Sequence, residues 1–503
     1  MTKKHLPHLT YNWISAFGAV AAVITLLTIL FLLVLNMVYG AITPYLGVLL
    51  YMLLPFILVA ALLLIPFGMY VKRRALMRAG ELTPRKWPSI DLNNHQQRNA
   101  TMIFVFGTVL LLMISSVGVY KAYQFTDSVQ FCGLVCHRVM APEYTTYQNS
   151  PHAHVKCVDC HIGPGAGWYA KSKLSGMYQV YATIFNKYPR PLPTPIEDLR
   201  PVQQECYQCH WPSQFYGAKQ RVFIHYMYDK GNTYWPVNLL IETGGGYPGA
   251  AQTSGIHWHM NISQKVEYIS RDSVKQDIPW IRTTNRATGK VNIYEDSVKP
   301  LTKKEVESAE IRTMDCIDCH NRPSHNFRSP DHEVDLAIFQ GKIPADLPDI
   351  KKACVTAMAK EYATDREAME GISKSITEFY KNGYPDVYSK HPDAVEKAVA
   401  ATQTAFSENI FPHMKARWSE YPNNIGHFIY KGCMRCHDGN HKDASGNLVV
   451  HDCNTCHIIL SQGGGENGGL LDLKKGLDFR HPADIGDAWK ETLCSDCHSG
   501  VQP

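Results

Sequence analysis

Seven pairs of cysteines, each followed directly by a histidine, constrain this chain more than any other feature of its sequence. Fourteen of the fifteen cysteines belong to these pairs. The pairs are Cys132/Cys136, Cys157/Cys160, Cys206/Cys209, Cys316/Cys319, Cys433/Cys436, Cys453/Cys456 and Cys494/Cys497. The histidines that follow them are His137, His161, His210, His320, His437, His457 and His498. Because only 23 of the 503 residues are histidines, seven chance coincidences would have a probability on the order of 10⁻⁹.

This spacing is typical of covalent haem attachment. Two thiols two residues apart reach the two vinyl groups of one porphyrin, and the next residue then places an imidazole under the iron. A zinc site would need two pairs to combine, and it would not explain the adjacent histidine. The first motif has three residues between its cysteines instead of two, and we interpret it as a variant attachment site because it stands in series with the others. The sequence therefore predicts seven covalently bound haem c groups.

The remaining cysteine, Cys354, lies in a stretch with helical periodicity. Ile350, Cys354 and Ala357 fall on one face of that helix. We interpret Cys354 as a buried structural thiol and not as a redox group.

Three apolar stretches at the N-terminus predict membrane-spanning helices. Residues 14–38 and 46–69 form two uncharged runs, which a Gly/Thr/Pro break at 40–45 separates, and residues 100–120 form a third. Each run has about the 20 apolar residues needed to cross a bilayer. A cleaved signal peptide is the alternative for the first run, but its length and the second run that follows argue against it.

Basic residues predict the orientation of these spans. The loop at 72–99 carries seven basic and two acidic side chains, and Lys3 and Lys4 precede the first span. By the positive-inside rule, the N-terminus and this loop are cytoplasmic, and everything after Lys121 lies outside. The first 120 residues have a charge balance of +7, so the total of +5 leaves −2 for the rest. An acidic exported part favours basic partner proteins and argues against nucleic acid.

The fold class expected is mainly α with little regular structure: three transmembrane helices, then an exported domain with seven haems. The predicted domains are a membrane anchor at 1–121, a haem domain with motifs one to four at 122–325, a helical insert at 326–425, and a distal haem cluster at 426–503. In the insert, Met369, Ile372, Ile376 and Phe379 repeat at helical spacing, and 393–406 predicts a second helix. Residues 211–310 predict irregular packing with short strands, and the Gly-rich segment 461–469 predicts a loop.

Thirteen histidines outside the motifs follow Lys121 and can supply the sixth ligand of each iron. Iron with two imidazole ligands transfers electrons, whereas substrate chemistry needs an open position. The supply of histidines therefore favours an electron relay over a terminal reductase. The candidate axial ligands are His152, His225, His257, His259, His325, His427, His441, His451 and His481, and we rank His332, His391 and His413 in the insert lower.

The predicted spans contain no histidine, so a haem ligated inside the bilayer is not expected. Electrons must then arrive at the outer face of the membrane, for which a lipid-soluble quinol is the natural donor.

The region around the first two motifs resembles a known family. A transmembrane helix, a haem motif with a nearby methionine, a Y-x-x-Y-x-x-S-x-H pattern and a second motif are similar to the NapC/NrfH/NirT quinol dehydrogenases. The matching residues are Cys136, His137, Met140, Tyr144, Tyr147, Ser150, His152, Cys157, Cys160 and His161. The whole chain, with three spans and seven motifs, resembles the larger ImcH-type inner-membrane cytochromes of metal-respiring bacteria.

The resemblance implies that quinol reacts at the first haem, with Met140 near its iron and a lysine holding the quinol, for which Lys171 and Lys173 are both candidates. Met140 stands three positions after His137, one more than in the family, and the family's acidic residue after the lysine is replaced within LSGMY. The resemblance also implies a bacterial inner-membrane location, with the haem domain in the periplasm.

The leading hypothesis is a menaquinol-oxidising cytochrome that passes electrons to soluble, basic multihaem cytochromes of the periplasm in anaerobic or extracellular respiration. One alternative is a non-catalytic anchor and relay subunit of a larger periplasmic oxidoreductase. Another is a terminal reductase of a nitrogen or sulfur oxyanion, which the surplus of histidines disfavours. Gly-rich nucleotide motifs after a strand are absent from the sequence, so NAD is not expected. Homo-oligomerisation stays open.

Overall fold

The computed structural model describes residues 8–39, 44–80, 91–163, 165–195, 202–211, 217–244, 255–260, 263–464 and 476–501. The chain divides into two compact units: Met1–His137 with Lys156–Val158, and Arg138–Val155 with Asp159–Pro503. Most of the predicted break at 40–45 and of the predicted loop at 461–469 lies outside the described residues.

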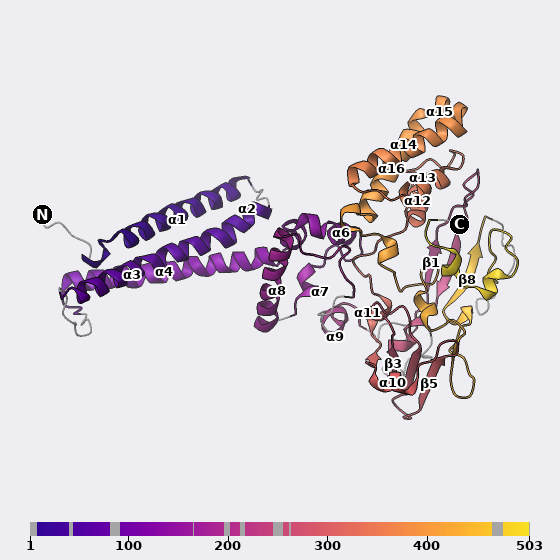
Figure 1. Cartoon of the computed structure of the whole chain (residues 1–503), viewed down its shortest axis with the longest axis horizontal. Coiled ribbons are helices and arrows are strands. Elements are labelled where there is room, and N and C mark those ends of the chain that lie inside the picture. The colour runs from indigo at the N-terminus through magenta and orange to yellow at the C-terminus, as the bar shows by residue number, and fades with distance from the viewer. Residues whose placement is uncertain are drawn as a thin grey trace. The chain divides into compact units, whose positions relative to one another are not determined.

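Long helices dominate the first unit (Figure 1). They are α1 (Trp13–Tyr39), α3 (Leu54–Arg78) and α4 (His95–Thr126), accompanied by α2 (Pro44–Val48), a π-helical turn at Leu49–Leu53, a 3-10 turn at His8–Thr10 and α5 (Val129–Leu134). Three stretches are long and apolar enough to cross a membrane, namely Trp13–Leu35, Leu46–Arg78 and Gln97–Thr126. The three predicted spans are thereby confirmed as helices.

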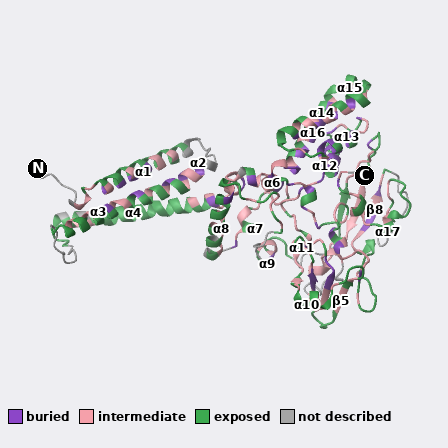
Figure 2. Ribbon diagram, viewed as in Figure 1, coloured by how far each residue is buried: buried purple, intermediate pink, exposed green. Residues whose placement is uncertain are grey.

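Small residues let α1 and α3 pack closely. A Cβ atom on Gly18 would lie 2.7 Å from the Ala61 carbonyl oxygen, so only glycine fits there. The Ser15 hydroxyl donates to the Ile65 carbonyl at 2.8 Å, which adds a polar contact of the kind that joins membrane helices. By contrast, none of the apolar window of α4 is buried, and its surface is coloured as exposed in Figure 2. This apolar surface suits contact with lipid.

The second unit holds a group of helices between Pro330 and Asn409. Its helices are α12 (Pro330–Phe339), α13 (Ile350–Ala359), α14 (Asp365–Gly383), α15 (Pro385–Lys390) and α16 (Pro392–Asn409). Both helices expected from the sequence are confirmed, as α14 and α16. The remaining helices and 3-10 turns of this unit are α6 (His137–Gln148), α7 (Cys157–His161), α8 (Ala166–Ile184), α9 (Val202–Glu205), η3 (Cys206–Gln208), η5 (Ile256–Met260), α10 (Lys303–Ser308), α11 (Cys316–Cys319), η6 (Pro412–Met414), η7 (Trp418–Glu420), η8 (Gly432–Arg435), η9 (Cys453–Thr455), α17 (Ala488–Glu491) and α18 (Cys494–Cys497).

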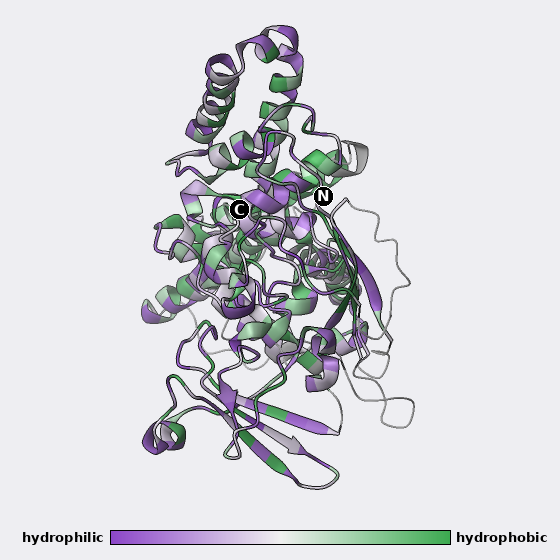
Figure 3. Cartoon of the chain, turned by 90° about the vertical axis from the view of Figure 1, so that its right-hand side faces the viewer, coloured by the Kyte–Doolittle hydropathy of each residue, from purple (hydrophilic) through white to green (hydrophobic). Residues whose placement is uncertain are grey.

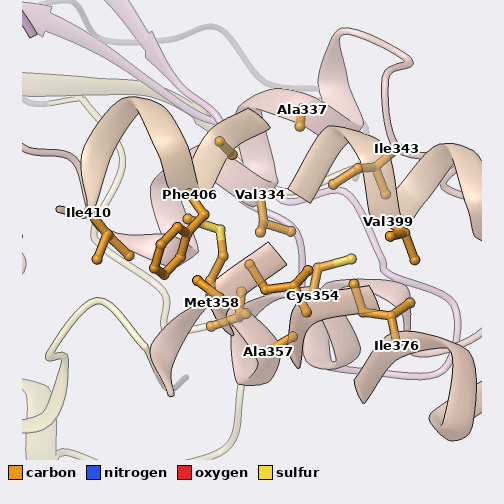
Figure 4. Packing of buried hydrophobic residues seen from close by; sticks show 14 of the residues in the cluster. Val334, Ala337, Ile343, Cys354, Ala357, Met358, Ile376, Val399, Phe406 and Ile410 are labelled. Carbon is orange, nitrogen blue, oxygen red and sulfur yellow. The ribbon is translucent and has the colours of Figure 1, made fainter. Parts of the chain in front are cut away.

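Local sequence signals explain how α14 forms and packs. The Thr364 hydroxyl accepts a hydrogen bond from the Glu367 amide and caps the first turn. Ile372, Ile376 and Tyr380 recur at four-residue intervals and are fully buried. They join the main apolar core, in which Cys354 is also fully buried (Figure 4). The prediction of a buried Cys354 is therefore confirmed, and burial raises the pKa of its thiol to about 12.

Two antiparallel sheets occupy much of the region for which the sequence predicts irregular packing. One sheet has the order β1-β2-β8, formed by Lys219–Phe223, Val237–Ile241 and His457–Gln462. The other has the order β6-β3-β4-β5-β7, formed by Arg312–Thr313, Gln264–Ile269, Trp280–Asn285, Val291–Asp296 and His441–Lys442. Hydrophobic and hydrophilic residues both occur along these strands (Figure 3). Among the described strands longer than two residues, only β5 alternates strictly in burial, so the two-residue period confirms short strands here but is too weak to locate each strand from the sequence.

A buried ion cluster ties β-rich and helical parts of the second unit together. The Lys351 ammonium lies 2.7 Å from an Asp331 carboxylate oxygen and 2.8 Å from one of Asp335. Burial raises the pKa of Asp335 to about 7, although Lys351 opposes the rise. His225, Asp331 and Asp335 are close enough together to hold a metal ion. Because the ammonium already supplies the positive charge between the carboxylates, we interpret the cluster as structural.

We expect Lys351→Met to lower the free energy of unfolding of the helical group by about 3–5 kcal/mol, because it leaves two buried carboxylates without their cation. The neighbouring Lys352 is exposed, so Lys352→Met should change this free energy by no more than about 0.5 kcal/mol. Hydrogen exchange of α12 and α13 amides under increasing denaturant measures both effects. Equal effects of the two substitutions would contradict the role given to Lys351.

Candidate haem-ligand pairs

Six of the seven motif histidines face a second histidine across a nearly constant gap. The ring centroids are 5.8 to 6.2 Å apart in every pair. The pairs are His161/His325, His210/His152, His320/His257, His437/His259, His457/His427 and His498/His481.

This gap is the one that a metal ion between two imidazoles requires. With a metal–nitrogen distance of about 2 Å on each side, the two ring centroids lie about 6 Å apart. Ring stacking does not explain the separation, since the interplanar angle ranges from 8° for His257/His320 to 89° for His259/His437. The distance between the ring centroids stays constant while the angle between the ring planes varies. This is expected when both rings are placed to bind one metal ion between them, because the rings can then rotate about the line through that ion.

Hydrogen bonds orient most of the partner histidines. The Nδ1 atoms of five of them lie within 3.0 Å of a backbone carbonyl oxygen: His152 on Pro323, His257 on Thr243, His259 on Ile256, His325 on Glu143 and His481 on Ala483. An Nδ1–H donor bound in this way fixes the tautomer and leaves Nε2 as the ligand atom.

Burial keeps the paired imidazoles in the form that binds metal. Burial lowers the pKa of both His259 and His325 to about 4. It also lowers the pKa values of the motif histidines His161, His320 and His457. These rings are neutral at pH 7, and a neutral imidazole has the lone pair that a metal ion needs.

The pairs do not follow proximity in the sequence. His325 stands five residues after the fourth motif's histidine, yet it faces His161 of the second motif. His152 lies between the first and second motifs, but it faces His210 of the third. A motif and its partner are thus held by different segments of the chain, so the six pairs would fasten these segments together.

Three histidines predicted as ligands face no motif histidine within the described part of the chain. His441 is buried, and its two ring nitrogens lie 2.8 Å from an Asp438 carboxylate oxygen and 2.7 Å from the Ile278 carbonyl oxygen. Although burial opposes it, these two hydrogen bonds raise the pKa of His441. His225 lies against Phe428, with ring centroids 5.4 Å apart, and His451 is exposed. We therefore assign none of the three to an iron.

The side chain of His137, in the first motif, lies outside the described residues. Met140 is half-buried on α6, the helix that begins at His137. Lys171 and Lys173 both lie on α8, where Lys171 is exposed, with its Nζ 5.5 Å from the centroid of the Trp168 ring, and Lys173 is half-buried.

Buried polar atoms near the His161/His325 pair add functional residues that the sequence reasoning did not select. Arg322 Nε and Glu143 Oε2 are both buried with no hydrogen-bond partner among the described residues. Burial lowers the pKa of Arg322 and raises that of Glu143 to about 7. A buried guanidinium N–H without a partner fits a porphyrin propionate. The position of Arg322, two residues after His320, is the one sequence signal that could have indicated it.

The attachment cysteines differ in how far the chain itself covers them. Ten of the fourteen are half-buried, whereas Cys209, Cys433, Cys453 and Cys497 are exposed. A cysteine that serves only to pack is usually buried, as Cys354 is, so the exposure of Cys209 in the third motif does not fit a structural thiol. A thiol that forms a thioether must instead lie where a porphyrin vinyl group can reach it, and exposure meets this requirement. Attachment at Cys209 therefore stays a prediction from the motif.

Thiols of consecutive motifs are electrostatic neighbours from the second motif to the seventh. Burial raises the pKa of Cys206 to about 12, with contributions from Cys316 and Cys160. Burial likewise raises the pKa of Cys456 to about 11, with a contribution from Cys433. The neighbouring thiols are Cys160/Cys206, Cys206/Cys316, Cys319/Cys433, Cys433/Cys456 and Cys453/Cys494. The motifs therefore follow one another in space in the order of the sequence.

The residues present fit covalently attached haem. All fifteen cysteines are free of disulfides, and fourteen stand in attachment pairs. Six of the seven motifs also have a second imidazole at the separation that axial ligation requires, and a hydrogen bond to a backbone carbonyl orients five of these six imidazoles.

Comparisons with known proteins agree with this chemistry. The NapC/NirT cytochrome c family, N-terminal region, matches residues 94–191. The chain is 43% identical over 499 residues to the cytochrome c-type protein ImcH of Geobacter sulfurreducens, which covers 99% of this chain and 97% of that protein. It is 31% identical over 111 residues to the cytochrome c-type protein NrfH of Wolinella succinogenes, covering 22% of this chain and 62% of that protein. No solved structure matches the chain. The chain therefore belongs to the ImcH family of c-type cytochromes and carries the N-terminal region of the NapC/NirT cytochrome c family.

Proposed function

We propose that this protein is a menaquinol-oxidising cytochrome of the bacterial inner membrane, which carries seven haem c groups and passes electrons to soluble periplasmic cytochromes. The six imidazole pairs are the observation that carries the proposal. An iron with two imidazole ligands has no position open for a substrate, so the paired sites suit electron transfer. The sequence relationship to ImcH and NrfH, both cytochrome c-type proteins, supports the same assignment.

Quinol oxidation is assigned to the first motif, which differs from the other six. Each covalently bound haem would supply an iron that accepts one electron at a time. The Met140 thioether, one helical turn after His137 on α6, is proposed to lie near this iron and would be available to it as a ligand. A thioether is a weaker ligand than imidazole and raises the reduction potential of the site.

Lys171 or Lys173 is proposed to bind a quinol oxygen. An ammonium group near that oxygen stabilises the negative charge that develops there as the proton leaves. The two lysines are two residues apart on α8, so they point in different directions, and one of them is expected to perform this role.

The proposed orientation places the N-terminus in the cytoplasm and residues after Lys121 in the periplasm. The basic residues at the cytoplasmic ends of the spans support it. Protons from quinol would then be released on the outer side.

An acidic surface beside the seventh motif is proposed as the exit. Asp484, Asp487, Glu491 and Asp496 are exposed there, with Lys490 paired to Asp487 at 2.7 Å. An exposed acidic surface attracts a basic partner and speeds its encounter. A basic soluble cytochrome is the partner that this charge favours.

We expect Met140→Ala to slow the reduction of the haems by a menaquinol analogue about ten- to a hundredfold, because it misplaces the reacting site. The spectra of the other six haems should not change. Met369→Ala, in the helical group, is the control and should leave the rate unchanged. Purified protein with full haem content that quinol does not reduce would instead favour the anchor and relay alternative.

We expect His481→Gly to convert one of the seven irons to a high-spin form, because the seventh motif loses its second imidazole. Added imidazole should restore the low-spin spectrum, since it can bind in the space that the side chain leaves. His391→Gly, at an exposed histidine of the helical group, serves as the control. Electron paramagnetic resonance measures the outcome, and a His481→Gly protein without a high-spin signal would contradict the assignment.

A further inference from the structure

Two partner histidines lie on the same short turn. Residues Ile256–Met260 form the 3-10 turn η5, with the sequence IHWHM. Its first histidine, His257, faces His320 of the fourth motif at 6.2 Å, and its second, His259, faces His437 of the fifth at 5.8 Å. The sequence next to either motif does not indicate this arrangement. The fifth motif, for example, lies far from η5 along the chain.

The turn is held firmly from both sides. The amide of Ile256 donates to the Glu242 carbonyl at 2.9 Å, and the amide of His257 donates to the Thr243 carbonyl at 3.0 Å. Gly255 makes this approach possible, because its φ is +83° and a Cβ atom there would lie 2.4 Å from the Glu242 carbonyl oxygen. On the other side, Trp258 packs against the core of the five-stranded sheet.

The two motifs that η5 faces are also fastened to each other. Arg435 stands between the cysteines of the fifth motif, and Asp318 stands at the equivalent position of the fourth. The Arg435 guanidinium donates to the Asp318 carbonyl at 2.8 Å, a contact between residues 117 positions apart. The same guanidinium donates to the carbonyl of Lys275 at 2.7 Å.

The Asp318 carboxylate is held in turn by three side-chain donors from outside its own motif. Tyr268 donates at 2.7 Å, Arg312 at 3.0 Å and Lys275 at 3.3 Å. Both motifs are therefore fixed to the same sheet that supports η5.

We propose that η5 ligates two irons at once, those of the fourth and fifth motifs, and so forms the joint between the membrane-proximal and distal groups of haems. A 3-10 helix rises only about 2 Å per residue, so two irons bound to residues 257 and 259 must belong to neighbouring haems. Arg435 acts as a positioning residue, because it holds the two attachment loops in register with the two imidazoles. This inference rests on haem attachment at these motifs, but it does not depend on quinol being the electron donor.

The first test compares His259→Met with His451→Met in the purified full-length protein. The sequence position of His451, close to motifs five and six, makes it the rival ligand. We expect His259→Met to lower the number of bis-imidazole irons from six to five in the electron paramagnetic resonance and near-infrared magnetic circular dichroism spectra. His451→Met should leave both spectra unchanged. The inference is overturned if His451→Met alters the spectra or if His259→Met does not.

The second test uses a change that touches neither ligand. Gly255→Ala should disturb two of the seven irons together, because an added methyl group would displace the whole turn from Glu242. Gly289→Ala is the matched control, since Gly289 also has a positive φ of +69° but open space around its Cβ position. Disturbance of one iron or none by Gly255→Ala contradicts double ligation, even if His259→Met fails to accumulate.

Both tests read out iron ligation and use no quinol. A protein with the expected ligation changes but no quinol oxidation would reject the proposed function and keep the joint. If the protein oxidises quinol but neither variant changes the ligation of any iron, the proposed function is kept and the joint at η5 is rejected.

Discussion

The pairing of imidazoles across a gap of about 6 Å is the constraint on which the second unit depends. Each pair joins a haem motif to a segment that is often distant in the sequence, as His325 and His161 illustrate. Two ligand bonds to one iron, together with two thioether bonds to its porphyrin, would cross-link these segments in the way that disulfides cross-link secreted proteins. Such links would let a unit with short strands and many irregular segments keep a defined structure, while the larger of the two apolar clusters among the described residues lies mainly in the helical group.

The sequence was sufficient to predict features that depend on local patterns. The membrane spans follow from uncharged length, and α14 follows from the four-residue spacing of Ile372 and Ile376. The attachment residues of six motifs are predicted from C-x-x-C-H alone and remain a prediction, and burial would not have selected an exposed cysteine such as Cys209. Each of these patterns is set by neighbouring residues, so no knowledge of tertiary contacts is needed.

The assignment of partner histidines could not be predicted in this way. His441 follows the fifth motif closely, but Asp438 and the Ile278 carbonyl occupy its nitrogens. The ring that faces His437 belongs to His259, which a turn pinned to the end of β2 brings into place. Tertiary hydrogen bonds and the packing of Trp258 decide the partner, and a single sequence carries no direct signal of either. Short strands were expected in residues 211–310, but their positions and pairing were not, since strands such as β3, buried along most of their length, lack a two-residue alternation.

The iron at the first motif is proposed to have a ligation that differs from that of the other six irons. Near-infrared magnetic circular dichroism of the oxidised protein tests this difference most directly. The method separates bis-imidazole iron from iron with a thioether ligand and from high-spin iron. We predict six bis-imidazole irons per chain and one iron of different ligation, which Met140→Ala alone alters. Seven equivalent bis-imidazole irons, or two or more irons with an open position, would contradict the account.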